Sequence, residues 1–566
     1  MVDFKKMISN ILAQEIGVIG EEEIYNIIEI PKHTEMGDFA FPCFKLSRLL
    51  RKSPNMIAEE LKEKIKCNEL FEAVSAVSGY LNFTINKQFY AKTVINEVLE
   101  KKELFGATDI GKGRTVIIEY SSVNIARAFH MGHIRSTMIG NSLYKIYKFL
   151  NYNVIGINHL GDYGTQFGKL ITAYKLWGNK KDIEERGVDE LLRLYVKYHD
   201  EAEKNPLLDD EARSWFTKLE NGNEEAYEIW KWFREISLIE FERVYRLLGV
   251  SFDSYAGESF YSDKMPAVLK ELREKNILTK SDGAEIVDLS EYGMPPAIVT
   301  KRDGSTLYVT RDIAAAKYRK DTYSFYKNIY VVGSPQKLHF QQLFKILEIM
   351  GYDWANDLVH VDFGTVSLEE GSLSTRKGRV VFLEDVLLKA IEMAKNIIEE
   401  KNPTLENKEL VAKQVGVGAV VFQELFNNRI KDYTFSWSKS LAFDGETGPY
   451  VQYAHARCCS IIEKAGDIDI YDVDYSLLTD SSSMEIIKKL YQFADIVIDA
   501  HDKYEPSLIT RYVTQLAHCF NKFYHDNPIL TNDLSLTKAR LALVYAVKYT
   551  LKNGLNLIGI EAPERM

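Results

Sequence analysis

Long apolar runs are missing from this sequence. No stretch approaches the about 18 consecutive apolar residues that a helix needs to cross a bilayer, so we expect no membrane-spanning segment. The first residues, MVDFKKMISNILAQEIG, are interrupted by Gln14 and Glu15, which is not typical of a signal peptide. Phe4, Ile8 and Leu12 instead predict an amphipathic helix that packs on a core.

Cysteine is scarce as well. The five cysteines form no CxxC pair and match no zinc-ligand spacing. They are Cys43, Cys67, Cys458, Cys459 and Cys519. An odd number of scattered cysteines predicts reduced, mostly buried thiols in a cytoplasmic protein, and we expect no protein-held metal site.

An excess of positive charge is also absent, because the formal net charge is −10. This value neither indicates nor excludes nucleic-acid binding, which requires a local basic surface rather than a basic average. With 566 residues, of which 46% are hydrophobic and 27% charged, the chain has a globular composition and room for about two to four domains.

Residues 1–110 predict a small α+β domain. Ser53 is a suitable N-cap and Pro54 suits the first turn of the helix that follows. The stretch VSGYLNFTI alternates like a strand with one buried face. The charged and glycine-containing stretch KKELFGATDIGKGR, residues 101–114, is interpreted as a linker.

Residues 111–385 predict an α/β domain with a parallel sheet. Val116–Ile118 form an apolar run typical of a strand buried on both faces, and NVIGIN is a second such run. Between them a helix repeats apolar residues on one face: Ile139, Leu143, Ile146 and Leu150. This βαβ order predicts a nucleotide-binding sheet. Residues 175–300 are more polar and are interpreted as an insertion, after which we expect the sheet to resume with 304–319 and 327–340.

Residues 386–566 predict a helical bundle. In the last long helix Leu543, Val547 and Leu551 share one face, and Asn553–Gly554 predicts its C-terminal stop.

The segment AFHMGHIRST lies where the first predicted strand gives way to a helix. His130 and His133 lack a third ligand at a recognisable spacing, so a metal site is disfavoured. They could serve only as surface or capping residues. The alternative is an anion site, because backbone N–H groups at a helix N-terminus favour phosphate and imidazoles can donate hydrogen bonds to its oxygens.

Several motifs resemble one family. HMGH, residues 130–133, is similar to the first signature of class I aminoacyl-tRNA synthetases. The surrounding EYSSVNIARAFHMGHIRSTMIGNSLYKI, together with INHLGDYGTQFGKL, LYVTRDIAAAKYR, GSPQKLHFQQLF, LSTRKGRVVFLEDVL, FNNRIKDYTFSW and TGPYVQYAHARCCSI, resembles arginyl-tRNA synthetases in the family's order. The resemblance implies a Rossmann-like catalytic domain, a small α+β N-terminal domain that contacts tRNA, and an α-helical C-terminal anticodon-binding domain.

The implied reaction has two steps. Arginine and ATP form arginyl-adenylate with release of pyrophosphate, and the arginyl group then moves to the 2′-hydroxyl of the 3′-terminal adenosine of tRNA(Arg). The substrate supplies its own nucleophile, so catalysis requires positioning and phosphate stabilisation. Magnesium is expected to accompany the ATP phosphates. The family commonly requires bound tRNA before it activates arginine, and a monomer suffices.

The resemblance assigns catalytic and ATP-binding residues at both signatures. These are Arg127, His130, Gly132, His133, Ser374, Arg376 and Lys377. The second signature reads GSLSTRKG, residues 371–378, with Ser372 in place of the family's first lysine, and Arg127–Ala128 stands where the family usually has Lys-Pro. An arginine keeps the charge but differs in reach and geometry, so which of the three cations contacts which phosphate stays open.

The resemblance also assigns an arginine pocket. Asp312 would pair with the substrate guanidinium in bidentate fashion. The other members are Glu119, Ser122, Asn124, His159, Tyr308 and Gln336. Without the resemblance, Asp312 is interpreted as an acid in the first turn of a helix capped by Thr310, where it stabilises the helix and nothing more.

For tRNA, aromatic and basic residues alternate in the C-terminal region, which suits base stacking and backbone neutralisation. The candidates are Arg429, Lys431, Tyr450, Tyr453 and Arg457. Two alternatives stay open. A small nucleotidylyltransferase would explain only the first signature. A catalytically impaired paralogue that binds tRNA is favoured by the departures at Arg127, Ala128 and Ser372 and disfavoured by the retained His130, His133 and Asp312.

Overall fold

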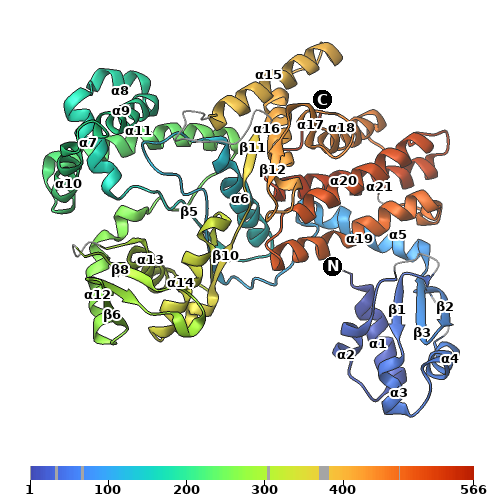
Figure 1. Ribbon diagram of the computed structural model, residues 1–566. Coiled ribbons are helices and arrows are strands. Elements are labelled where there is room, and N and C mark those ends of the chain that lie inside the picture. Colours follow the sequence, from blue (N-terminus) through green and yellow to red (C-terminus); the bar gives the residue numbers. More distant parts are fainter. Residues whose placement is uncertain (1, 32–35, 66–68, 303–305, 369–380, 471) are drawn as a thin grey trace.

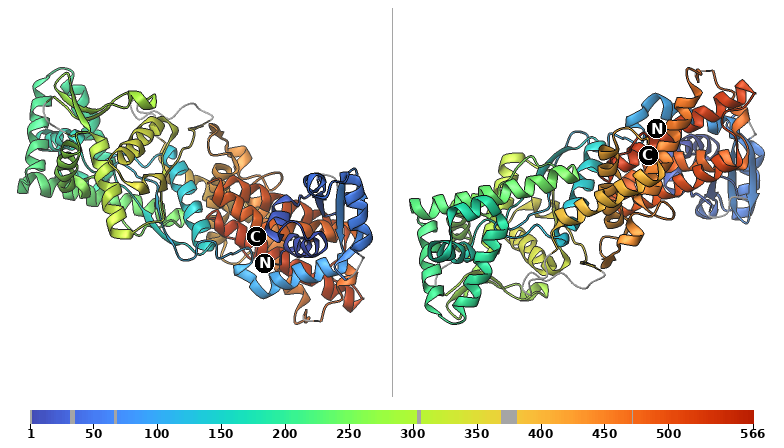
Figure 2. Two further views of the ribbon diagram at one scale, coloured as in Figure 1. Left: turned by 90° about the horizontal axis from the view of Figure 1, so that it is seen from below. Right: turned by 90° about the horizontal axis from the view of Figure 1, so that it is seen from above.

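The computed structural model describes all residues except 1, 32–35, 66–68, 303–305, 369–380 and 471. The molecule is elongated (Figures 1 and 2), with an α/β body in its middle. A group of helices lies at one end, and a helical bundle with the small N-terminal domain lies at the other. In the described part of the chain no helix is both long and apolar enough to span a membrane.

The N-terminal domain places helices beside a three-stranded antiparallel sheet of order β1-β3-β2. Its elements are α1 (Phe4–Ile16), α2 (Glu21–Ile27), β1 (Phe39–Pro42), α3 (Phe44–Leu50), α4 (Pro54–Lys64), β2 (Phe71–Val77) and β3 (Tyr80–Ile85). The predicted start of α4 is confirmed, because the Ser53 side chain accepts from the Met56 N–H and Pro54 is the first helical residue. Phe4, Ile8 and Leu12 are fully buried, as predicted.

The chain then joins the C-terminal bundle before it enters the α/β body. Helix α5 (Lys87–Lys101) packs on the late helices α19 and α21, and η2 (Lys102–Leu104) follows it. The Asn553 side chain donates to the carbonyl oxygens of Lys102 and Phe105, at 2.9 and 3.1 Å. The first and last thirds of the sequence are therefore fastened together.

The central sheet is entirely parallel and has the order β10-β9-β4-β5. Its strands are β4 (Thr115–Glu119), β5 (Asn153–Ile157), β9 (Lys327–Val331) and β10 (Leu358–Val361). The predicted βαβ unit is confirmed, with α6 (Ile134–Phe149) as its helix. A Cβ on Gly140 would lie 2.1 Å from Cβ of Tyr120, so glycine lets α6 approach the chain beyond β4 closely.

Between β5 and β9 the chain forms a helical group and a small antiparallel sheet of order β6-β7-β8. The elements are α7 (Thr165–Trp177), α8 (Lys180–Arg186), α9 (Val188–Ala202), α10 (Leu207–Glu220), α11 (Glu224–Leu248), η4 (Glu258–Lys264), α12 (Met265–Glu274), β6 (Leu278–Ser281), β7 (Ala284–Val287), η5 (Ser290–Tyr292) and β8 (Ala297–Thr300). The prediction that the sheet resumes with 304–319 is wrong, since α13 (Tyr308–Tyr323) occupies most of that stretch and the parallel sheet resumes at β9.

The remaining elements complete the body and the C-terminal bundle. They are η6 (Ser334–Gln336), α14 (Lys337–Ile349), η7 (Asp353–Asp357), β11 (Val366–Leu368), α15 (Leu383–Lys401), α16 (Lys408–Phe426), β12 (Tyr433–Phe435), α17 (Trp437–Ser440), α18 (Gly448–Ala465), η9 (Tyr475–Leu478), α19 (Ser481–Asp502), α20 (Ser507–Asp526) and α21 (Leu534–Leu557). The predicted stop at Asn553–Gly554 is wrong. A Cβ on Gly554 would lie 2.3 Å from Cγ1 of Val513, so this glycine serves close helix packing and α21 continues past it.

Candidate active site

The candidate residues gather where the parallel strands end. Glu119 is the last residue of β4, His159 follows β5 by two positions, and η6 follows β9. The carboxyl ends of neighbouring parallel strands form the crevice in which open α/β sheets bind ligands. Glu119, His159 and Gln336, which lie far apart in the sequence, thus share one edge of the sheet.

The segment after β4 turns sharply over this edge. Ser121 and Ser122 have positive φ values of 69° and 50°. The Ser122 N–H donates to Oδ1 of Asn158 at 3.2 Å, whereas its buried hydroxyl finds no partner among the described residues. Asn124 bridges to Gly161, where a Cβ would lie 1.8 Å from Oδ1 of Asn124. Ser122 and Asn124 therefore lie just beyond the carboxyl end of β4, against the segment that follows β5.

The first signature, residues 130–133, forms a short 3₁₀ turn, η3 (Met131–His133), at the start of α6. Nδ1 of His130 accepts from the Gly132 N–H at 3.1 Å, and Nδ1 of His133 accepts from the His130 N–H at 3.2 Å. A backbone N–H can only donate, so each neutral ring carries its proton on Nε2. The capping interpretation and the anion interpretation are thus compatible, since Nδ1 caps and Nε2–H remains a donor.

Both signature imidazoles are held neutral. Burial, together with the charge of Arg127, lowers the pKa of His130. Burial lowers the pKa of His133 to about 3, with the neighbouring His130 adding to the effect. The two rings stack with centroids 3.9 Å apart. Arg127 donates to Oε1 of Gln166 at 3.1 Å, which places a cation beside the signature.

The residues that follow the second signature return to the first. The Met131 N–H donates to the Val381 carbonyl at 3.0 Å, and the Leu383 N–H donates to the Phe129 carbonyl at 2.9 Å. His130 also bridges to Phe382. Ser374, Arg376 and Lys377 themselves lie outside the described residues.

Glu119 meets a buried cation that the sequence analysis missed. The Arg319 guanidinium lies 2.7 Å from Oε2 of Glu119, and both side chains are buried. The same guanidinium lies 3.3 Å from Nδ1 of His159. Arg319 follows Asp312 by two helical turns on α13 and so shares its face, which is a spacing the sequence does display.

Asp312 on α13 lies near His159, whose charge acts on it. Its Oδ2 is 2.6 Å from Nε2 of His339, a second residue that the sequence analysis missed. Burial acts to raise the pKa of Asp312, but the hydrogen bond from His339 and the charges of His339, His159 and Arg311 bring it below its ordinary value. For His339 the directions are reversed. Burial acts to lower its pKa, but the hydrogen bond to Asp312 and the charge of Asp312 outweigh burial, so the pKa is raised.

The interpretation of Asp312 as a first-turn acid beneath a Thr310 cap is wrong. Helix α13 begins at Tyr308, and the Thr310 hydroxyl donates to the Val299 carbonyl. Asp312 therefore lies beyond the first turn, where the helix dipole gives little reason for an acid.

A second acid–base pair lies beside it. Arg311 donates to Oε2 of Glu258 at 2.7 Å. Burial raises the pKa of Glu258 to about 6 despite the opposing charges of Arg311 and His159. Tyr308 and Gln336 stand at the exposed rim, with Tyr308 61% exposed and its ring 4.9 Å from the Arg311 guanidinium.

The predicted tRNA residues fall into two groups. Tyr450, Tyr453 and Arg457 lie on α18, and the Arg457 guanidinium lies 4.7 Å from the Tyr453 ring and 4.9 Å from that of Tyr524 on α20. Lys431 is exposed, but Arg429 is largely buried and pairs with Asp362 at 2.9 Å. Within the described ranges no three His, Cys, Asp or Glu side chains are arranged to hold a metal ion.

Comparison with family models divides the chain into three matches. Residues 94–437 match "tRNA synthetases class I (R), catalytic domain", residues 451–566 match "DALR anticodon binding domain", and residues 3–85 match "Arginyl tRNA synthetase N terminal domain".

Individual relatives match over the whole chain. The arginine–tRNA ligases of Halothermothrix orenii and Clostridioides difficile are 59% and 60% identical to it, with 100% of each chain covered. The solved arginyl-tRNA synthetase of Thermus thermophilus superposes with a TM-score of 0.82 at 26% identity, over 99% of this chain and 100% of that one. The predicted α/β body, small N-terminal domain and helical C-terminal domain are confirmed. This protein belongs to the arginyl-tRNA synthetase family.

Proposed function

We propose that this protein activates L-arginine with ATP and transfers it to tRNA(Arg). The observation that supports this most strongly is that two chemically different groups of side chains lie along one edge of the sheet. Neutral imidazole donors of the first signature stand at one end, and the carboxylates of Asp312, Glu119 and Glu258 stand at the other. A substrate complex with phosphates at one side and a guanidinium at the other matches this polarity.

At the phosphate end, Nε2–H of His130 and of His133 would donate to oxygens of the α-phosphate as charge develops on them during attack by the arginine carboxylate. Gly132 leaves room for the nucleotide beside the backbone. Arg127, with Ser374, Arg376 and Lys377 of the second signature, would neutralise the departing pyrophosphate. Because no group of the chain becomes covalently bonded, positioning carries the rate.

At the arginine end, Asp312 would receive the planar guanidinium, which has five N–H donors and matches a carboxylate in bidentate fashion. Tyr308 and Gln336 at the rim would add hydrogen bonds. Ser122, Asn124 and His159 would hold the α-amino and carboxylate groups of the substrate. Glu119 acts here through Arg319, which it holds against His159. Lysine would leave parts of such a pocket unpaired, and this gives discrimination.

Magnesium would enter with ATP, as part of the substrate. The described residues around His130 offer imidazole and guanidinium groups, which do not fit Mg²⁺, since that ion prefers carboxylate, phosphate and water oxygens. No step of the proposal depends on a protein-held ion.

For tRNA we propose that Tyr450, Tyr453 and Arg457 contact it on the α18–α20 face. Lys431 and Arg429 would form a second contact, with the Arg429 side chain held by Asp362. The proposed domains are 1–110, 111–385 with an insertion at 175–300, and 386–566. A cytoplasmic monomer is proposed. The four described cysteines, Cys43, Cys458, Cys459 and Cys519, are free thiols, and Cys67 lies outside the described residues.

The test is arginine-dependent exchange of labelled pyrophosphate into ATP, with and without tRNA and with lysine as the control amino acid. Exchange that occurs with arginine but not with lysine, and only when tRNA is present, supports the full proposal. Exchange without tRNA keeps the ligase and removes the coupling to tRNA. A folded protein that binds tRNA but shows no exchange under any condition would instead be the impaired paralogue.

A further inference from the structure

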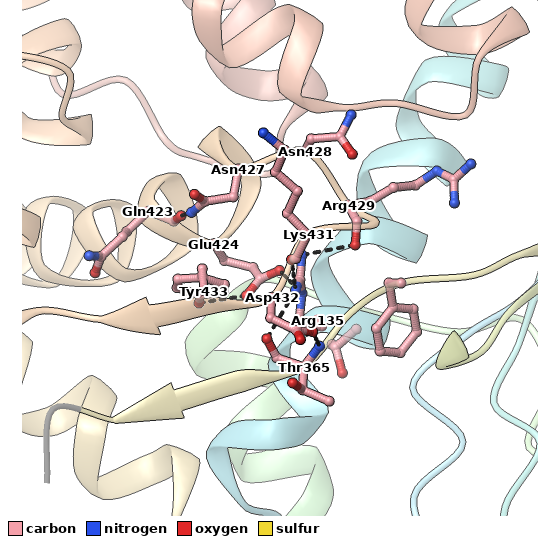
Figure 3. A network of polar contacts seen from close by, with 12 residues as sticks. Arg135, Thr365, Gln423, Glu424, Asn427, Asn428, Arg429, Lys431, Asp432 and Tyr433 are labelled. Carbon is pink, nitrogen blue, oxygen red and sulfur yellow. Dashed lines mark hydrogen bonds and ion pairs between the residues drawn. The ribbon is translucent and has the colours of Figure 1, made fainter. Parts of the chain in front are cut away.

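A buried ion pair lies directly behind the first signature and outside the substrate contacts proposed above. Arg135, in the first turn of α6, is fully buried, and its Nε donates to Oε1 of Glu424 at 2.9 Å (Figure 3). Glu424 lies on α16, 289 positions further along the chain, and is 1% exposed. Tyr433 donates to its second oxygen at 2.6 Å.

The rest of the Arg135 guanidinium binds backbone rather than side chains. It donates to the carbonyl oxygens of Lys431 at 2.8 Å, Arg429 at 3.2 Å and Thr365 at 3.3 Å. These carbonyls belong to the two chain segments that lead into β12 and β11 (Figure 3). One planar group therefore fixes α6, α16 and both strand entries at a single point.

The two segments that lead into β11 and β12 also contact each other directly. Strands β11 and β12 are parallel, with Val366 opposite Tyr433. The Thr365 N–H donates to Oδ1 of Asp432 at 2.6 Å, and a Cβ on Gly364 would lie 2.6 Å from that same oxygen. The segment before β12 is also held by the C-terminal bundle, because the Asn428 side chain donates to Oε2 of Glu505 at 2.8 Å.

Stability alone is a weak reason for such a pair. Two charges removed from water lose solvation that their mutual attraction barely restores, so well-packed apolar replacements are often as stable. Both side chains are buried, and burial raises the pKa of Glu424 while Arg135 and Tyr433 act to lower it. What an apolar pair cannot supply is the fork of directed bonds to three carbonyls.

We propose that Arg135 and Glu424 are a positioning pair for the ligase reaction, and this inference rests on the proposed function. The pair sets the first turn of α6, and with it the imidazoles of His130 and His133, against the β11–β12 ladder and α16. Neither residue touches a substrate. A shift of about 1 Å at reacting groups can lower a rate about 10²-fold, so the pair acts on kcat and not on substrate affinity.

The test compares two variants whose stability and geometry are affected differently. Arg135→Lys keeps the charge beside Glu424 but loses the fork of bonds to the carbonyls. The double variant Arg135→Met with Glu424→Leu removes both charges and keeps an apolar, filled site. Circular dichroism and thermal unfolding check the fold of each, and pyrophosphate exchange in the presence of tRNA gives kcat and the KM values for arginine and ATP.

For both folded variants we expect kcat to fall at least about tenfold, with both KM values within about twofold of wild type. Ser142→Ala is the matched control, because Ser142 lies buried on the same helix and donates to the Leu557 carbonyl of the C-terminal bundle at 2.9 Å. This variant should keep the wild-type kcat even where it unfolds earlier. If the double variant does not fold, Arg135→Lys carries the test.

Wild-type kcat in a folded Arg135→Lys variant would overturn the proposal, as would a raised KM for arginine at unchanged kcat. Failure of the proposed function is seen separately, because the wild-type protein itself would then show no exchange.

Discussion

The phosphate end and the arginine end of the candidate site are held in place by different kinds of contact. At the phosphate end, backbone N–H groups orient His130 and His133, and both rings are neutral. At the arginine end, charged side chains orient one another through the contacts of Glu119, Glu258 and Asp312 with arginines and a histidine. Backbone contacts hold a ring in place without adding charge, whereas ion pairs place negative charge where a cationic substrate would bind.

This difference implies opposite sensitivities. A side-chain substitution at the phosphate end removes a donor but leaves the backbone that placed it. At the arginine end each charged group is also the partner of another, so one substitution leaves its neighbour unpaired, and effects are not additive. Substrate affinity should therefore depend on the arginine end and catalytic rate on the phosphate end.

The largest effect is expected for Asp312→Asn. Loss of the carboxylate leaves the substrate guanidinium without its anion, and kcat/KM for arginine should fall about 10²- to 10³-fold, mainly through KM. Asp357→Asn, a half-exposed acid 3.9 Å from Lys320, is the control and should change little. An unchanged KM for arginine in steady-state exchange assays would contradict this role for Asp312.

A somewhat smaller effect is expected at the other end for His133→Ala. Removal of one donor to developing phosphate charge should lower kcat about 10²-fold, with KM for arginine within about twofold. His525→Ala, at a largely exposed histidine on α20, serves as the control. A variant that loses arginine affinity instead of rate would remove the distinction between the two ends.

Arg127→Gln should lower kcat about tenfold, because a cation beside the phosphates is lost while both imidazoles remain. Since Arg127 helps to lower the pKa of His130, that pKa should rise in the variant. Arg127→Lys keeps the charge and should retain more activity. Proton NMR titration of His130 measures the pKa shift, and its absence would mean that the cation does not act on this ring.

The smallest effect is expected from pH. When His339 loses its proton as pH rises, the negative charge of Asp312 is no longer neutralised by it and attracts the substrate guanidinium more strongly. KM for arginine should therefore fall about threefold as pH rises through the His339 pKa. A His339→Gln variant should lose this step and keep only the contribution of Glu258, whose pKa is about 6. A wild-type KM that rises with pH would reverse the assignment.

The same comparison predicts opposite signs in stability. The folded pKa of His339 is raised, so its contribution is complete below the unfolded pKa and disappears as pH rises through the folded value. The folded pKa of His133, about 3, lies below its unfolded value. Its contribution is therefore present above the unfolded pKa and is lost as pH falls. Thermal unfolding of wild type, His339→Gln and His133→Ala across pH 5 to 8 separates the two contributions.

Local sequence patterns predicted much of the fold. The apolar run Val116–Ile118 and the periodic helix after it identified the βαβ unit, and Ser53 identified the start of α4. These features depend on neighbours in the chain, which a sequence displays directly. The resemblance then indicated where the site residues lie, and the structure brings Glu119, His159 and Asp312 to one sheet edge.

The errors and omissions have a common physical origin. Thr310 and Gly554 look like a cap and a stop, but their tertiary partners Val299 and Val513 decide their roles. Arg319 and Glu119 are 200 positions apart and Arg135 and Glu424 are 289 apart. No spacing rule predicts such pairs, because they exist only when separate elements pack together.

The bonds from Arg135 have a consequence for how this region can change during evolution. Their acceptors are main-chain oxygens, among them that of Lys431, so any residue at that position offers the same acceptor. Substitutions there leave the link intact, whereas deletion of one residue between Asn428 and Asp432 would move the oxygens out of reach. These hydrogen bonds thus constrain the number of residues in this segment rather than their identity.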